Sequence, residues 1–120
     1  MEDSFVEILK LLLPEIIVDY FELTSYKKGE ELLHLYLKEI NSIPKEYRQN
    51  KLSSKGFFDE ITVQDFPIRG HKVYLHITRR RWLNEDTGQL VFRDWNLVAE
   101  GTRVTQGFAS FLKEINRFQA

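Results

Sequence analysis

The sequence predicts an α+β protein, and two patterns support this fold class. Apolar residues alternate with polar or aromatic ones over positions 33–38 and 72–78, which is typical of half-buried strands. Apolar residues also recur at helical spacing near both ends of the 120-residue chain. The expected arrangement is an N-terminal helix, antiparallel β hairpins that form a ribbon-like sheet without metal, and a C-terminal amphipathic helix. We expect an α+β domain over residues 1–100 and the start of a truncated helical region over 101–120.

The first expected element is a short amphipathic helix over residues 4–13. Ser4 and Glu7 have the spacing of a capping box, in which two side chains satisfy backbone N–H groups at a helix start. Pro14 then ends this helix or starts another turn, because its ring cannot continue a helix from within.

Residues 18–40 fit either a buried helix or a β hairpin. Three leucines alternate with polar or aromatic residues over 33–37, and this favours the hairpin. Its first strand is expected over 21–26, and its turn is Lys27-Lys28-Gly29-Glu30.

A polar segment over 41–58 contains Pro44 and Gly56 and is interpreted as a loop or a short helical connection. A second β unit follows, with strands expected over 60–65, 72–82 and 90–98 and turns at Pro67, Gly70 and Asp86-Thr87-Gly88. The last element is a helix that Thr105 can cap. Its apolar stripe is formed by Phe108, Phe111, Leu112, Ile115 and Phe118.

The composition excludes several classes of protein. The chain contains no cysteine, so neither a disulfide framework nor a thiolate zinc site can form, which fits a reducing compartment. The start of the chain lacks the basic segment of a secretory signal, and the apolar runs around residues 11–18 are broken by Pro14 and are too short to cross a bilayer. We therefore expect a cytoplasmic protein without a membrane partner.

The net charge of −1 hides an uneven distribution. Residues 1–46 carry five basic and ten acidic residues, whereas the remainder carries twelve basic and eight acidic ones. The interval between Phe66 and Asn84 contains no acid, and its basic residues are Arg69, Lys72, Arg79, Arg80 and Arg81. Such polarity suggests that one surface attracts polyanions.

The consecutive arginines at 79–81 allow two interpretations. If the preceding strand buries its apolar residues, Arg79 and Arg81 emerge where the core stops, and Arg80 lies on the opposite face. One interpretation is that these charges protect an edge strand from aggregation or pair with acids of the facing strand, namely Glu85, Asp86 and Asp94. The other is a ribbon that contacts DNA phosphates, which guanidinium groups bind in a bidentate way.

The aromatic and imidazole side chains have ordinary structural interpretations. Trp82 and Trp95 could stack on bases, but aromatic residues in strands of a small domain are expected in the core. His34, His71 and His76 have no further ligand at metal-binding spacing, so we expect no metal site.

Catalytic motifs are not found in the sequence. The carboxylates Asp59, Glu60 and Asp65 could bind magnesium. Adjacent residues of a strand point to opposite faces, however, so we expect these carboxylates to be exposed to solvent. There is no glycine-rich phosphate loop, nucleophile elbow or Cys/His pair. We expect neither enzyme activity nor a cofactor.

Two segments of the chain resemble a known family. The segments "DEITVQDFPIRGHKVYLHITRRRW" and "GTRVTQGFASFLKEI" resemble the N-terminal region of insertion-sequence transposases of the ISAon group. That group is itself similar to transposases that begin with a zinc ribbon and continue into a helix-turn-helix. The most recognisable residues are Asp65, Pro67, Gly70, Tyr74, Leu75, Arg80, Arg81, Trp82, Gly101, Arg103, Thr105 and Phe108.

The resemblance covers nearly the whole chain but departs from the broader set at the metal site. In that set, cysteine pairs follow the first hairpin and the basic-aromatic strand. Here those places hold "NSIPKEYRQNK" and "LNEDTG", which contain no cysteine. The resemblance therefore implies a ribbon held by packing and turn chemistry instead of zinc.

The resemblance implies a DNA-binding or assembly module whose DDE-type catalytic part lies in a separate or downstream chain. The implied partners are double-stranded DNA at the transposon ends and the catalytic transposase chain, and a homodimer is compatible with both. The residues expected to contact the DNA backbone are Arg69, Lys72, Arg79, Arg80, Arg81, Arg93 and Arg103. An alternative function is docking on the catalytic chain, or dimerisation, through the apolar stripe of the last helix: Phe108, Phe111, Leu112, Ile115 and Phe118.

Overall fold

The computed structural model describes residues 7, 11, 13, 15–68, 70–100 and 106–117. Within this part of the chain the fold is α+β, which confirms the predicted class. The elements in chain order are α2 (Glu15–Tyr20), β1 (Phe21–Lys28), β2 (Leu32–Glu39), the 3-10 turn η1 (Lys45–Tyr47), β3 (Leu52–Phe57), β4 (Ile61–Ile68), β5 (His71–Thr78), β6 (Arg80–Asn84), β7 (Gln89–Val91), α3 (Trp95–Glu100) and α4 (Gln106–Arg117). None of the described helices is long and apolar enough to cross a membrane.

Four of the strands form one sheet in the order β1-β2-β5-β4. The two hairpins, β1 with β2 and β4 with β5, are antiparallel. They are joined by a parallel pairing of β2 with β5, in which Leu35 lies opposite Leu75. Because the register is unbroken along this pairing, alternate residues of both strands point to the same face.

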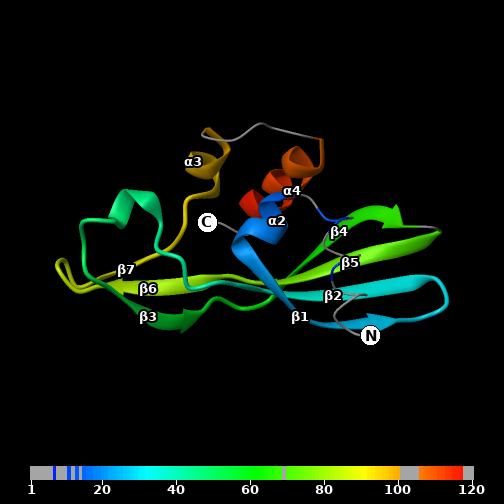
Figure 1. Ribbon diagram of the computed structural model, residues 1–120, viewed down its shortest axis with the longest axis horizontal. Coiled ribbons are helices and arrows are strands. Elements are labelled where there is room, and N and C mark those ends of the chain that lie inside the picture. The colour runs from blue at the N-terminus through cyan, green and yellow to red at the C-terminus, as the bar shows by residue number, and fades with distance from the viewer. Residues whose placement is uncertain are drawn as a thin grey trace.

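One face of the four-stranded sheet forms the hydrophobic core. Buried aliphatic residues of β2, β4 and β5 pack there against Ile17 of α2, Trp95 of α3, and Phe111 and Ile115 of α4. Figure 1 shows all the described helices on this side of the sheet. Trp95 stacks on Phe21 with ring centroids 5.4 Å apart. The last helix therefore belongs to the same core as the sheet.

The strands β3, β6 and β7 form a second, three-stranded sheet. The strand β5 continues into β6 with only Arg79 between them, so one stretch of chain serves both sheets. The sheets lie end to end, as Figure 1 shows, and the molecule measures 49 × 28 × 25 Å. Trp82 of β6 is 1% exposed, and its indole N–H donates to Asn41 Oδ1 at 2.9 Å. This bond holds the segment before η1 against the second sheet.

Several local predictions are confirmed. The β1–β2 hairpin forms where the leucine alternation indicated a strand. The turn at residues 86–88 joins β6 to β7, and Gly88 has a φ of +75°, which glycine adopts without strain. Most of the helix expected over 4–13 lies outside the described residues, although Glu7 and Leu11 are helical. Thr105, the expected cap of the last helix, also lies outside them.

The strand expected over 90–98 is wrong beyond Val91. A helix begins after Asp94, because its Oδ1 accepts the backbone N–H groups of Asn96 at 3.0 Å and Leu97 at 3.2 Å. These bonds cap the start of α3, which occupies the rest of the predicted strand.

Two other predictions need correction. The segment expected as a loop or a short helical connection over 41–58 contains the strand β3. This strand is short and polar, so the sequence shows no strand pattern there. Its pairing with β6 shifts register between Ser54 and Phe57, where Gly56 has a φ of +77°. The single strand expected over 72–82 is divided at Arg79 between the two sheets.

Candidate nucleic-acid interface

A buried carboxylate lies at the junction of the two sheets. Glu39, the last residue of β2, is in phase with the buried leucines of that strand and is 1% exposed. Its carboxylate accepts the backbone N–H of Arg80 at 3.0 Å and the Nε–H of Arg93 at 2.9 Å. Burial raises the pKa of Glu39, although these hydrogen bonds and the positive charge of Arg93 act in the opposite direction. The neighbours of Glu39 therefore compensate its burial only in part.

Arg93 is fully engaged with the protein. It is 4% exposed, and besides its bond to Glu39 it donates from Nη2 to the carbonyl oxygen of Ser42. Its guanidinium also lies 4.5 Å from the ring centroid of Tyr20. Arg93 is therefore not available to a DNA backbone, contrary to the expectation from the sequence.

Arg80 is half-buried, and its hydrogen bonds connect strands of the protein. Its Nε donates to the carbonyl oxygen of Glu39 at 3.3 Å, and its Nη1 donates to Ser54 Oγ at 2.7 Å. The guanidinium lies 4.6 Å from the ring centroid of Phe57. Arg80 thus links β2, β3 and β6, and its contribution to an interface is limited to its charge.

Arg79 and Arg81 differ from Arg80 and Arg93 in the hydrogen bonding of their Nε atoms. Arg79 is 7% exposed, and Arg81 is half-buried. The Nε atom of each is buried and has no partner among the residues that the structure describes. Both guanidinium groups lie over the ring of Phe58, at 5.0 Å for Arg79 and 5.5 Å for Arg81. Burial lowers the pKa of Arg79, and the negative charge of Glu39 acts in the opposite direction. Two guanidinium groups beside one ring, whose Nε atoms lack an acceptor in the described part of the chain, form a candidate site for an anion.

The surroundings of these two arginines suit a nucleic acid. The ring of Phe58 meets the ring of Phe92 edge-on at 5.3 Å, and Phe92 is 45% exposed. Gly56 lets Arg81 lie close to β3, because a Cβ atom at that position would be 3.3 Å from Arg81 Nη2. Guanidinium groups bind phosphate and aromatic rings stack on bases. We call Phe58, Arg79, Arg81 and Phe92 the arginine-aromatic cluster.

The acids expected to pair with the arginines have other partners. Asp86 accepts hydrogen bonds from the Nδ2 of Asn50 and the backbone N–H of Lys51, both at 3.1 Å, and these bonds lower its pKa. Glu85 lies 3.7 Å from the amino group of Lys51, and Asp94 caps α3. The predicted pairing of the arginines with acids of the facing strand is therefore wrong, and Glu39 instead forms hydrogen bonds with Arg80 and Arg93.

The other residues expected to contact DNA are dispersed. Lys72 is exposed at the start of β5, at the opposite end of that strand from Arg79. Arg69 and Arg103 lie outside the described residues. The structure thus gathers four of the predicted residues around Glu39 and Phe58, namely Arg79, Arg80, Arg81 and Arg93, and leaves Lys72 apart.

The apolar stripe of the last helix is largely part of the core. Phe111 is 3% exposed and Ile115 is fully buried, while Leu112 is partly buried against the same cluster. Phe111 and Ile115 are therefore not free for the docking that the sequence suggested for this stripe, because they pack in the core with the four-stranded sheet. Phe118 and the side chain of Phe108 lie outside the described part of the chain.

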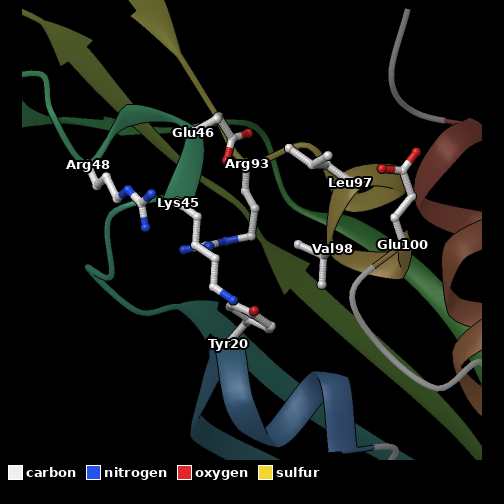
Figure 2. Close-up of a pocket in the computed structure, with 8 residues that line it drawn as sticks. All are labelled: Tyr20, Lys45, Glu46, Arg48, Arg93, Leu97, Val98 and Glu100. Atoms are coloured by element: carbon white, nitrogen blue, oxygen red, sulfur yellow. The ribbon is translucent and has the colours of Figure 1, made fainter.

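A separate cleft of about 550 Å³ lies between η1 and α3. Figure 2 shows Lys45 and Arg48 on one side of it, Leu97, Val98 and Glu100 on the other, and Tyr20 at one end. Arg93 reaches the middle of the cleft but is held by Glu39. Cations and anions both line this cleft, so its charge selects neither sign of ligand.

The described residues contain no group of three or more histidine, aspartate or glutamate side chains placed to hold a metal ion. Comparison of this chain with known protein families, curated proteins and solved structures finds no match. The function must therefore be inferred from the residues and their geometry.

Sequence reasoning missed three residues of the site. Glu39 had a detectable signal, because it continues the alternation of three buried leucines and so places a carboxylate on the core face. Phe58 and Phe92 had none, since a phenylalanine beside a loop is equally expected in a core. Only the fold brings them to Arg79 and Arg81.

Proposed function

We propose that this chain is a DNA-binding module of an insertion-sequence transposase and that Arg79 and Arg81 hold phosphates of the DNA backbone. The observation that carries the proposal is a pair of buried Nε groups beside Phe58 that have no acceptor within the described part of the chain. A buried guanidinium without an acceptor is unfavourable, and a phosphate supplies both acceptor oxygens and negative charge. The resemblance of residues 59–82 and 101–115 to a transposase region supports DNA as the source of the phosphate.

The proposed role is to position DNA, and the chemistry is assigned to a separate or downstream DDE-type catalytic chain. The proposed ligand is double-stranded DNA at the ends of the mobile element, in the cytoplasm. Contacts to phosphates fix the orientation of a protein on a duplex without reading its sequence. The arginine-aromatic cluster therefore accounts for affinity, and it assigns no preferred base sequence.

The test is the binding of a short fluorescent duplex, followed by anisotropy over a series of salt concentrations. Replacing Arg79 and Arg81 together by glutamine removes two phosphate contacts. Counterion release then predicts a slope of log affinity against log salt that is shallower by about 1.8, or about 0.9 for each contact. Duplexes with transposon-end and scrambled sequences should show the same change, because the contacts are to the backbone.

A matched control separates a local contact from net charge. Lys113 and Arg117 are exposed on α4, and changing both to glutamine removes the same charge elsewhere. This variant should keep the slope of the wild-type protein. Equal slopes for the wild type and the Arg79/Arg81 variant, with circular dichroism showing that both are folded, would refute the proposed contact.

A further inference from the structure

The face of the four-stranded sheet that points away from the helices has a distinct composition. The core face carries the buried aliphatic residues, and all the described helices lie on that side (Figure 1). The opposite face therefore presents the alternate positions of β2 and β5. Four of these positions hold rings, namely His34, Tyr36, Tyr74 and His76, and all of them are half-buried.

These four rings form a continuous stack across β2 and β5. Tyr36 and His76 are 4.5 Å apart with an interplanar angle of 14°. His76 stacks on His34 at 5.0 Å, and His34 stacks on Tyr74 at 5.5 Å. Both tyrosines lie at the ends of the stack, so each has one ring face that no other member of the stack covers. We call this set the ring ladder.

Hydrogen bonds fix the middle of the ring ladder. His34 Nδ1 and His76 Nε2 are 2.8 Å apart, and His76 Nδ1 lies 3.1 Å from Thr62 Oγ1 and 3.5 Å from Glu60 Oε1. Rings held in this way lose little conformational entropy when a ligand stacks on them. The ladder is therefore pre-organised for a planar partner.

A groove of about 360 Å³ adjoins one end of the ladder. Tyr36 and His76 line it together with Phe57 and Thr78, so aromatic rings from different strands border the same space. The amino group of Lys38, another lining residue, lies 4.4 Å from the ring centroid of Phe57. A flat ring bearing hydrogen-bonding groups fits these surroundings.

Positive charge borders the ring ladder on three sides. Lys38 lies at the groove, and Lys27, opposite His34, and Lys72, opposite Leu32, lie exposed on neighbouring positions of the same face. Among the residues that the structure describes, the acids on this face are Glu22, opposite Lys38, and Glu60, which lies beside His76 and lines the groove. Stacked rings with lysines around them match a chain of bases joined by phosphates.

We infer that this face binds unpaired bases of single-stranded DNA. Bases in a duplex are stacked on one another and cannot reach the tyrosine faces, whereas the bases of a single strand can stack on Tyr36 and Tyr74. Lys27, Lys38 and Lys72 hold the phosphates between them. The inference rests on the proposed function only in taking DNA as the nucleic acid, since the ring ladder and the arginine-aromatic cluster are separate groups of residues.

The test uses a fluorescent oligothymidine of about 12 nucleotides and measures its affinity by anisotropy. Tyr36→Val and Tyr74→Val remove a ring but keep a residue that suits a strand. Each should weaken single-strand binding about tenfold, because the stacking of one base on the ring is lost. Tyr36→Phe keeps the ring and should bind like the wild type, which shows that the ring and not the fold is responsible.

Tyr26→Val is the matched control. Tyr26 lies on the same sheet opposite Leu35, on the face that carries the core, and is 40% exposed. Its replacement should leave single-strand affinity unchanged. Lys38→Gln should make the salt slope shallower by about 0.7, whereas Tyr36→Val should lower affinity without changing the slope, because stacking releases no counterions.

Duplex binding distinguishes this inference from the proposed function. If the tyrosine variants bind the oligothymidine like the wild type, the inference is overturned, and a loss of duplex affinity in the Arg79/Arg81 variant still supports the proposed function. If Tyr36→Val changes the sedimentation of the protein and not its DNA affinity, the face is a self-association surface and the inference also fails. Single-strand binding that depends on the tyrosines supports it even if duplex binding is absent.

Discussion

The two sheets of this protein are stabilised in different ways. The four-stranded sheet is covered on one face by aliphatic and aromatic side chains that include Leu35, Leu75 and Trp95. The three-stranded sheet meets it at a junction where Glu39 and Arg93 are buried and hydrogen-bonded. A sheet of three short strands has little apolar surface of its own, so paired charges and their aromatic neighbours fill its junction.

This difference separates arginines that are hydrogen-bonded to Glu39 from arginines whose Nε atoms have no acceptor among the described residues. Arg80 and Arg93 are hydrogen-bonded to Glu39 and stabilise the junction. Arg79 and Arg81 come from the same stretch of chain but have buried Nε atoms without acceptors in the described protein. A basic cluster in a sequence therefore does not act as a unit, because hydrogen bonding ties some of its members to the protein and leaves the Nε atoms of others without an acceptor.

The largest expected effect on stability tests the apolar core of the four-stranded sheet. Trp95→Ala removes a ring that stacks on Phe21 at 5.4 Å and meets Phe111 at 5.8 Å. The free energy of unfolding should fall by about 4 kcal/mol through lost burial and the cavity left behind. Urea denaturation followed by circular dichroism measures this loss. A loss below about 1 kcal/mol would show that apolar packing does not stabilise the four-stranded sheet in the way described.

The next effect tests the buried charges at the junction of the two sheets. Arg93→Met removes the cation and leaves Glu39 buried without it, so the free energy of unfolding should fall by about 3 kcal/mol near neutral pH. Burial already raises the pKa of Glu39 above its ordinary value of 4.5, and loss of Arg93 raises it further. The folded variant then holds this proton at a higher pH than the unfolded chain does.

The sign of the pH dependence follows from that order of pKa values. Stability contributed by protonated Glu39 is fully present below pH 4.5 and is lost as pH rises through the folded pKa. Acidification from neutral pH should therefore reduce the deficit of Arg93→Met relative to the wild type, as measured by urea denaturation at both pH values. Lys51→Met, which removes an exposed cation 3.7 Å from Glu85, should change stability by less than about 0.5 kcal/mol. A deficit independent of pH would mean that Arg93 acts through packing alone.

The smallest expected change in the free energy of unfolding has the opposite sign. Arg79→Met keeps an unbranched apolar stem and removes a guanidinium whose buried Nε has no acceptor among the described residues. The free energy of unfolding should stay constant or rise by up to about 1 kcal/mol, because an unsatisfied polar group is removed. Duplex affinity should fall in the same variant. Clear destabilisation would instead assign Arg79 a structural partner and weaken its proposed role.

The sequence predicted the parts of the fold that depend on local patterns. The leucine alternation identified β2, the glycine at position 88 marked the turn before β7, and the apolar stripe identified α4. The parallel pairing of β2 with β5 was not predictable, because turn residues specify hairpins and carry no signal for strands far apart in the chain. β3 was missed because its six residues are mostly small or polar.

The site was predicted only in part for a related reason. The run of arginines pointed to the correct stretch of chain, but their separation into paired and unpaired groups depends on Glu39, which lies 40 positions before Arg79. Phe58 also reaches Arg79 and Arg81 only through the pairing of β3 with β6. Contacts between distant segments thus determined which arginines are hydrogen-bonded within the protein.

The parallel pairing of β2 with β5 also constrains how the chain folds. Leu35 meets Leu75, which is synthesised 40 residues later, so the first hairpin must wait with one edge of β2 unpaired. Its row of leucines remains uncovered for longer, because Phe111 and Ile115 of α4 are made later still. Pairings between distant segments form slowly, and an exposed strand edge promotes aggregation in the meantime. We therefore expect this domain to close only after α4 leaves the ribosome.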